Sequence, residues 1–452
     1  MAIARKEKST SLVSRVWDGR WEIAFWAGLL FVFLYVFPHL AFLKHANEMP
    51  RLFLSEALAR DGVAHVDAQL REYGYRKQMD LSRSVCLGGR ILAAADEALR
   101  RTKYQRNRHR RLRGRGGRFE TGCVEHTHPN KAPAQSYVGA FFYWMGGAWA
   151  GLVGGEFGLV QKLWWLRLGS SLLPVFVLLV LVDRITRRWV PERAPRRMTV
   201  LALGLGSLMM VYGLQLMSHG LSACLLFASF YALCSDAPGE SPVAWRLVAA
   251  GFCAGAAIAS DYQAGFGAVF VAAYGLYRVG VKPALIYGVV GGLGPLFFLG
   301  WYHQNLYGSP FWTGYEFLLA GGDQALHAEG VLGIVGPRPH PFWASMFSAR
   351  DGLVFLSPWV VFAAVGLYRS LQPGTVVAHD AITEDLTPAR KLAGSRARGT
   401  ALEIWKLSGA ALGGLSASLA VYRGAGAGAV EGSALALKLL GCAVVGWALL
   451  GM

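Results

Sequence analysis

Charged residues are scarce in this chain. They make up 16% of its 452 residues, whereas soluble proteins carry about 25%. Hydrophobic residues account for 54%, and they are grouped in runs that are too long for the strands of a soluble core. Because a spanning helix needs roughly 20 mostly apolar residues, the composition predicts an all-α polytopic membrane protein.

The sequence also lacks the short motifs that are typical of zinc-binding sites. It contains no CxxC pair and no HExxH helix, so no motif indicates zinc, and a divalent cation remains only an option. Of the six cysteines, four lie in apolar runs, where cysteine behaves as a small hydrophobic residue. Cys86 and Cys123 lie in a long polar loop and are disulfide candidates if that loop faces an oxidising compartment.

Acidic residues are few beside basic ones. The chain has 28 Asp and Glu against 45 Lys and Arg, a net charge of +17. Five basic residues precede the first apolar run, and six arginines lie in 183–197. Because basic loops stay in the cytoplasm, the N-terminus and this loop are predicted to be cytoplasmic, and the loop from Lys44 is outside.

The apolar runs predict about ten spanning helices. No internal repeat is visible, which argues against an inverted-repeat transporter. Residues 1–20 form a cytoplasmic N-terminus. Residues 21–370 form a transmembrane domain with outer loops 44–136 and 303–350. Residues 371–406 form a cytoplasmic linker, and residues 407–452 form a Gly/Ala-rich transmembrane hairpin. Tyr137–Val153 is expected to lie in the interface or re-enter. The predicted spans are Ile23–Leu43, Leu163–Val182, Met198–Met217, Leu221–Cys234, Leu247–Ala259, Ala264–Tyr277, Ala284–Tyr302, Gly352–Tyr368, Leu407–Tyr422 and Ser433–Leu450.

A basic insert, about residues 86–123, interrupts the first outer loop. Its segment Leu99–Arg118 holds ten Lys and Arg and no acid. It fits first a solvated segment facing anionic lipid, and second a surface that attracts anionic substrates. A nucleic-acid partner is not expected, because Tyr104 is the one aromatic residue there and the loop is predicted to be outside.

Glu48 is the first acid after the first predicted span. It fits the first turn of a helix that Asn47 caps and that runs to Arg60 and ends at Gly62, because a carboxylate there complements the helix dipole. It also fits a carboxylate held at the membrane surface, as a general base or as a ligand of an activating cation.

Lys131 lies in Pro129-Asn130-Lys131-Ala132-Pro133, just before an aromatic stretch. It fits an interfacial lysine whose ammonium reaches toward water, or a cation that binds a phosphate. His126 and His128 fit donors to the same phosphate or ordinary loop residues, and Asn130 is a candidate substrate ligand.

Asp261 follows an apolar run at a predicted outer helix junction. Ionisable residues at membrane depth are costly and usually functional, although an interfacial position would make Asp261 ordinary. Tyr262 and Gln263 come next and are able to hydrogen-bond a sugar hydroxyl. The segment Tyr307–Tyr315 (YGSPFWTGY) has glycines and aromatic residues that suit sugar binding or anchoring at the interface, so both ends of it are candidate binding residues.

Several blocks together resemble the membrane glycosyltransferases of the GT-C fold, which include the protein O-mannosyltransferases and the aminoarabinose transferases. The likeness is greatest to bacterial dolichyl-phosphate-mannose-mannosyltransferase-like proteins and covers roughly residues 20–370. The blocks are NEMPRLFLSEALARDG, PNKAP, SDYQAG, YGSPFWTGY and FSARDGLVFLSPW. The resemblance implies a GT-C-like bundle whose long first outer loop contains interfacial helices.

The same resemblance implies an activity. A sugar would move from a polyprenyl-phosphate donor to a lipid, glycan or protein acceptor at the outer face of a bacterial inner membrane, with inversion. The family places a catalytic acid at Glu48 and a lysine at the donor phosphate, Lys131. We hypothesise that both converge with Asp261 on one outward cavity, near Arg51 and Tyr315. The alternatives are a non-enzymatic transporter or scaffold, or an inactive family member.

Overall fold

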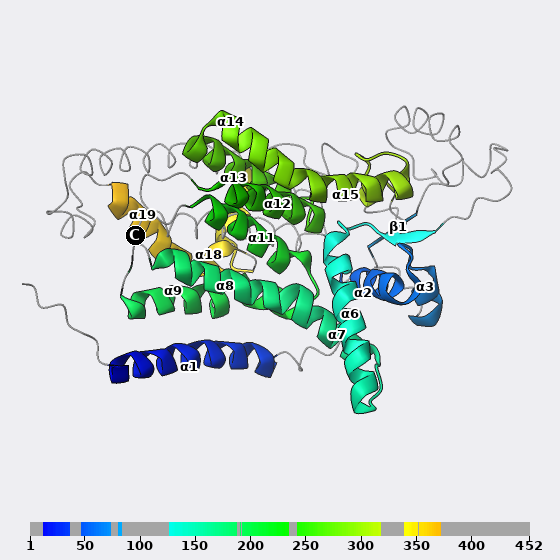
Figure 1. Ribbon diagram of the computed structural model, residues 1–452, viewed down its shortest axis with the longest axis horizontal. Coiled ribbons are helices and arrows are strands. Elements are labelled where there is room, and N and C mark those ends of the chain that lie inside the picture. Colours follow the sequence, from blue (N-terminus) through cyan, green and yellow to red (C-terminus); the bar gives the residue numbers. More distant parts are fainter. Residues whose placement is uncertain are drawn as a thin grey trace, which may run out of the picture.

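The computed structural model describes residues 12–36, 47–73, 80–83, 126–187, 190, 192–234, 242–317, 339–350 and 352–371. These residues are predominantly helical (Figure 1), as the composition predicts. The basic insert, the cysteines Cys86 and Cys123, residues 372–406 of the predicted linker and the C-terminal hairpin lie outside the described residues.

The elements follow in chain order, with three π-helical turns and one 3₁₀ turn among the α-helices. Two short strands pair antiparallel, with Ser82 opposite His128. The bounds are α1 Leu12–Val36, α2 Glu48–Glu56 and its π turn Ala57–Asp61, α3 Asp67–Tyr73, β1 Leu81–Arg83, β2 Thr127–Pro129, α6 Ala134–Val153, α7 Leu159–Arg167, the π turn Leu168–Leu172, α8 Leu173–Thr186, α9 Arg193–Leu205, α10 Leu208–Leu214, α11 Ser218–Leu233, α12 Ala244–Ser260, α13 Ala264–Val279, α14 Val281–Pro283, the π turn Ala284–Gly288, α15 Val289–Tyr307, the 3₁₀ turn Gly314–Phe317, α17 Pro339–Phe347, α18 Leu353–Leu356 and α19 Val360–Leu371.

Two helices of the described part are long and apolar enough to span a membrane. They are Leu159–Thr186, with 28 residues and a mean hydropathy of 2.1, and Val281–Tyr307, with 27 residues and 1.6. They indicate association with a membrane. The helices α11, α12 and α13 are apolar but shorter than these two, so the ten-span bundle stays a prediction.

Four details of the predicted helices and loops are wrong. The predicted span Met198–Met217 is broken into α9 and α10, which meet at an angle of 56°. Ser207 makes the break, because its Oγ accepts a hydrogen bond from the Met209 N–H and caps α10. The sequence leaves residues 218–220 as a tight turn between the predicted spans Met198–Met217 and Leu221–Cys234, but they form the first turn of α11.

The other two errors concern the second outer loop and the span after it. Helix α15 continues to Tyr307, so His303 lies in the helix rather than in the loop, and Gly308 ends the helix at a φ of +79°. The predicted span Gly352–Tyr368 is broken at Pro358 between α18 and α19. A proline lacks the N–H of the helical ladder and disfavours helical geometry in the residue before it.

Glycines allow α12 and α15 to pack closely. Gly251 and Gly255 lie four apart on α12, and Gly288 and Gly292 lie four apart on the facing helix. A Cβ atom on Gly251 would lie 2.0 Å from the Gly288 carbonyl oxygen, so only glycine fits there. Small residues at this spacing are typical of helix pairs in membranes, and this pair supports the junction that follows α12.

A smaller unit made of α2, α3 and the two strands lies at one end of the molecule (Figure 1). Its buried side chains, among them Leu52 and Phe53, pack against Leu163 and Leu166 of α7. The predicted helix from Glu48 is confirmed, and Gly62 ends it at a φ of +68°. Asn47 stands at the N-cap position but makes no side-chain cap bond.

Candidate active site

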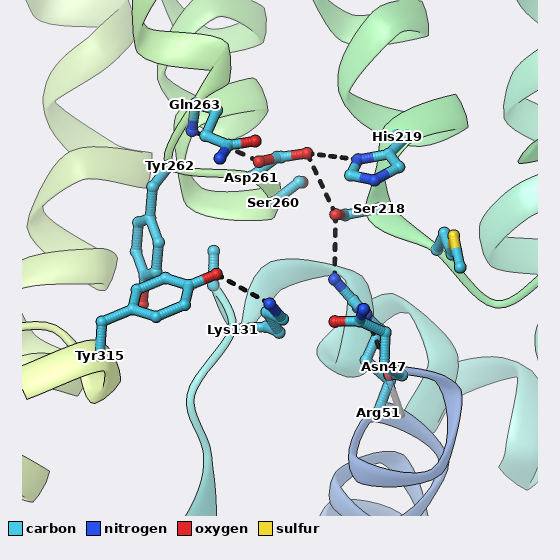
Figure 2. Close-up of a pocket in the computed structure, with 12 residues that line it drawn as sticks. Asn47, Arg51, Lys131, Ser218, His219, Ser260, Asp261, Tyr262, Gln263 and Tyr315 are labelled. Atoms are coloured by element: carbon cyan, nitrogen blue, oxygen red, sulfur yellow. Dashed lines mark hydrogen bonds and ion pairs between the residues drawn. The ribbon is translucent and has the colours of Figure 1, made fainter. Parts of the chain in front are cut away.

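Five separate parts of the chain meet at one small pocket (Figure 2). They are the start of α2, the turn between β2 and α6, the start of α11, the junction between α12 and α13, and the 3₁₀ turn after α15. The pocket is lined by Asn47, Arg51, Lys131, Ala132, Met217, Ser218, His219, Ser260, Asp261, Tyr262, Gln263 and Tyr315.

Asp261 is the acid of this pocket. It leaves α12 in an extended conformation, with φ −155°, and so turns its side chain toward the start of α11. Its Oδ2 lies 2.7 Å from His219 Nδ1 and accepts a hydrogen bond from Ser218 Oγ at 3.3 Å. Burial alone would raise the pKa of Asp261, but His219 and the positive charge of Arg51 outweigh it and hold that pKa below its usual value.

Arg51 connects α2 to the same cluster. Its Nη2 donates to Ser218 Oγ at 3.2 Å, and its Nη1 donates to the Asn47 carbonyl at 3.0 Å. Within the described part, its buried Nε has no hydrogen-bond partner. Because a buried donor without a partner is costly, this guanidinium is ready to donate to a ligand that carries oxygen.

Lys131 supplies a second cation. Its Nζ donates to the Tyr315 hydroxyl at 2.9 Å, lies 4.9 Å from the centre of that ring and lies 3.3 Å from a carboxylate oxygen of Asp80. The side chain is 11% exposed. The pocket therefore combines two cations with an ionised carboxylate and a histidine, which suits the binding of an anion and the transfer of a proton.

Six residues predicted from the sequence line this pocket. They are Arg51, Lys131, Asp261, Tyr262, Gln263 and Tyr315. Burial raises the pKa of Tyr262 well above its usual value, so its hydroxyl stays protonated, and it lies 2.8 Å from His303 Nε2. The remaining predicted residues, Glu48, His128, Asn130 and Tyr307, are not among those that line the pocket.

Glu48 forms a buried ion pair instead of facing the pocket. Arg167 donates to its Oε1 from Nε at 3.0 Å and from Nη2 at 2.7 Å, and the Leu216 N–H donates at 2.8 Å. The two side chains are 2% and 3% exposed. The expectation that Glu48 shares a cavity with Lys131 and Asp261 is therefore wrong in its geometry, because its carboxylate is bonded to Arg167 and Leu216 and does not line the pocket.

His128, Asn130 and Tyr307 shape the turn that carries Lys131. His128 Nδ1 lies 2.6 Å from the Ala64 carbonyl, and burial lowers the pKa of this histidine to about 4, so the ring is neutral. The Tyr307 hydroxyl lies 2.8 Å from Ser82 Oγ. Asn130 is buried and packs closely against Gly314: a Cβ atom on Gly314 would lie 2.5 Å from the Cα of Asn130.

His219 and Ser218 are the functional candidates that the sequence reasoning missed. The sequence presents them as a tight turn between two apolar runs, whereas they begin α11 and contact Asp261. The order and direction of the helices could have revealed these two residues. Two consecutive short apolar helices run in opposite directions, so the start of α11 and the end of α12 meet on the same side.

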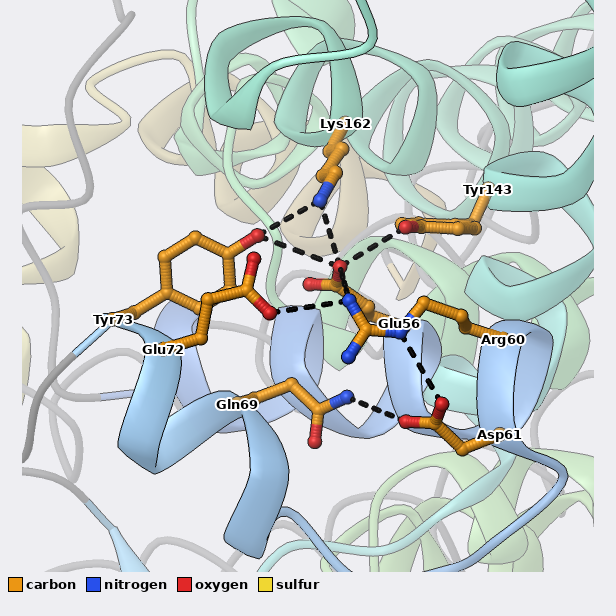
Figure 3. A network of polar contacts seen from close by, with 8 residues as sticks. All are labelled: Glu56, Arg60, Asp61, Gln69, Glu72, Tyr73, Tyr143 and Lys162. Carbon is orange, nitrogen blue, oxygen red and sulfur yellow. Dashed lines mark hydrogen bonds and ion pairs between the residues drawn. The ribbon is translucent and has the colours of Figure 1, made fainter.

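A second polar network lies outside the pocket and surrounds Glu56 (Figure 3). Its Oε1 accepts from Lys162 Nζ at 2.7 Å and from the Tyr143 hydroxyl at 3.0 Å, and the side chain is 0% exposed. Arg60 extends the network to Glu72 on α3. These contacts tie α2, α3, α6 and α7 together, which is a structural task.

One further group is able to ligate a metal. His65, Asp67 and His126 place a ligand atom each within 4.8 Å of one another, and none of the three lines the pocket.

Comparisons of this chain with protein-family models, with curated proteins and with solved structures found no match.

Proposed function

We propose that this chain is a membrane glycosyltransferase of the GT-C type, with about ten spans, which moves a sugar from a polyprenyl-phosphate donor to a lipid, glycan or protein acceptor at the outer face of a bacterial inner membrane. The observation that carries the proposal is the pocket in which the pair of Asp261 and His219 lies with Arg51 and Lys131. The two candidate spans support a substrate that is carried on lipid.

The reaction needs a base and a place for negative charge. The Asp261–His219 pair takes the proton of the acceptor hydroxyl, whose oxygen bonds to the anomeric carbon of the sugar. The bond between that carbon and the phosphate oxygen breaks, and polyprenyl phosphate leaves with one more negative charge than it carried as a diester. Lys131 and Arg51 stabilise this charge in the transition state.

The other lining residues fit a sugar between these groups. Tyr262 and Tyr315 offer ring faces and hydroxyls, and their ring centres lie 6.2 Å apart. Gln263 offers an amide that both donates and accepts. Glu48 takes a positioning role here, because its ion pair with Arg167 fixes the helix that carries Arg51.

A second candidate is a non-enzymatic transporter. Arg167 lies inside the candidate span Leu159–Thr186 and pairs with Glu48 of α2. Transporters typically place paired ionisable residues at such depths. This alternative predicts movement of an anion without any transfer of sugar.

The test is sugar transfer in membranes. Membranes that contain the wild type receive a panel of radiolabelled polyprenyl-phosphate sugars, and the product is counted after extraction. We expect Asp261→Asn and Lys131→Ala to lose at least ~100-fold in rate at unchanged expression, the size of a typical acid–base or charge-stabilising contribution.

Two exposed residues outside the pocket give matched controls. Glu156→Gln removes an exposed carboxylate and Lys282→Ala removes an exposed lysine, and both should stay within about twofold of wild type. Absence of transfer by the wild type from every donor would overturn the proposal, as would full activity in both pocket variants.

A further inference from the structure

Three metal-ligating side chains meet where two distant segments of the chain cross. His65 and Asp67 flank the buried Val66, Asp67 is the first residue of α3, and His126 immediately precedes β2. The Nδ1 atoms of His126 and His65 lie 2.6 Å and 3.3 Å from the same oxygen, Asp67 Oδ2. Two imidazole nitrogens and one carboxylate oxygen therefore lie within 4.8 Å of one another.

The two imidazole rings are stacked. Their centres lie 3.9 Å apart, and their planes differ by 10°. Because nearly parallel rings cannot both direct a nitrogen lone pair at one ion, one of the two rings has to rotate when an ion binds.

The backbone holds this group in place from both sides. The Val66 N–H donates to the Thr127 carbonyl at 2.9 Å. The Thr127 N–H donates to Asp67 Oδ1 at 2.9 Å. One carboxylate oxygen is thus fixed by the chain and the other faces both histidines. A hydrogen bond that orients a ligating carboxylate in this way is characteristic of built metal sites.

We propose that His65, Asp67 and His126 bind a Zn²⁺ ion, with water in the fourth position. Tetrahedral zinc with bonds of about 2.0–2.2 Å places its ligand atoms roughly 3.3 Å apart. The His65–Asp67 distance already has this value, and the His126–Asp67 distance would lengthen by about 0.7 Å. The three side chains are 22–37% exposed, so the ion and its water have access from solvent.

The mixed nitrogen and oxygen ligands also select the ion. Imidazole favours zinc and its neighbours, whereas Mg²⁺ and Ca²⁺ prefer oxygen ligands only. The ion would connect the segment after α2, which holds His65 and Asp67, to the segment of His126. Lys131 lies five residues after His126, in the turn that follows β2. The ion shares no residue with the pocket.

The experiment is a titration of the full-length chain, purified in detergent without a polyhistidine tag and freed of metal with a chelator. Calorimetry with ZnCl₂ should show a site that weakens at least about tenfold in His126→Ala and in Asp67→Asn. Asp67→Asn keeps an oxygen for the Thr127 N–H, so it removes the ligand charge and preserves the fold. Co²⁺ should give a visible spectrum of a four-coordinate site in the wild type and lose it in Asp67→Asn.

Controls separate this site from adventitious histidine binding. His340→Ala removes an exposed histidine on α17 and should leave the zinc titration unchanged. MgCl₂ should give no binding to the group. Equal zinc affinity in wild type, His126→Ala and Asp67→Asn would overturn the proposal. So would an equal loss in His340→Ala. The outcome does not depend on whether the protein transfers sugar, because zinc binding is measured directly.

Discussion

The ion pair between Glu48 and Arg167 gives a sharp test of what the first outer acid does. Both side chains are almost completely buried, and Arg167 provides two of the three hydrogen bonds that reach Glu48 Oε1. Arg167→Met replaces the guanidinium by an apolar side chain of similar length. Of the three hydrogen bonds to Glu48 Oε1, it leaves the one from the Leu216 N–H. Glu48→Gln instead leaves a buried guanidinium without its anion.

The size of the effect follows from burial. Removing one partner of a buried pair costs about 3–5 kcal/mol, because the remaining charge stays desolvated and uncompensated. Replacing both partners by residues of similar volume is close to neutral. We therefore expect Arg167→Met and Glu48→Gln each to lower the free energy of unfolding by about 3 kcal/mol or more. The double variant should lie within about 2 kcal/mol of wild type.

The assay is the free energy of unfolding from denaturant titration in detergent micelles, followed by circular dichroism. Single variants within about 0.5 kcal/mol of wild type, which is the range of an ordinary surface change, would refute the reasoning, and so would a double variant whose loss equals the two single losses added together. Sugar transfer gives a second readout. Because Glu48 lies outside the pocket, a stable double variant whose α2 stays in place should retain activity, and a stable but inactive one would show that transfer depends on Glu48, directly or through the position of α2.

Three further predictions concern the rest of the fold. Lys162→Met should lower the free energy of unfolding by about 3 kcal/mol, because buried Glu56 loses its closest cation. Adding Glu56→Gln should restore most of it, as melting in detergent would show. As pH falls from 6.5 toward 4, the unfolded chain takes up a proton that buried His128 refuses, so stability should fall by up to about 3 kcal/mol. His128→Gln should flatten that profile. Gly251→Leu should destabilise the protein by several kcal/mol, since its Cβ atom meets backbone, whereas Gly265→Leu, with open space around it, should cost far less.

The apolar runs located the later helices well. The predicted span Leu247–Ala259 corresponds to α12, Ala244–Ser260, and Ala264–Tyr277 corresponds to α13, Ala264–Val279. Hydrophobic periodicity cannot show where a run is broken by its own hydrogen bonds. The break at Pro358 was visible in the sequence, because proline interrupts helices. The break at Ser207 depends on a side-chain cap that the sequence shows only as one more serine.

The sequence predicted those pocket residues that combine a reactive side chain with a distinctive position. Asp261 is an acid between two apolar runs, and Lys131 lies in a turn before an aromatic helix, so each carries its own signal. Glu48 carries an equal signal but lies in an ion pair with a residue 119 positions later. Which cation faces an acid is decided by packing between helices, and no local pattern records it.

The helix α2 explains how these parts depend on one another. Over nine residues it carries Glu48, Arg51, Ser55 and Glu56, and together these bond to three other helices, α6, α7 and α11. Glu48 pairs with Arg167 of α7, and Arg51 donates to the start of α11. Ser55 donates to a carbonyl at the start of α6, and Glu56 pairs with a lysine of α7. These contacts position Arg51, one of the two cations of the pocket. Weakening any of them should therefore displace Arg51 before the protein unfolds. A loss of transfer in such a variant would therefore be recovered by a compensating partner, whereas a loss in Asp261→Asn would not.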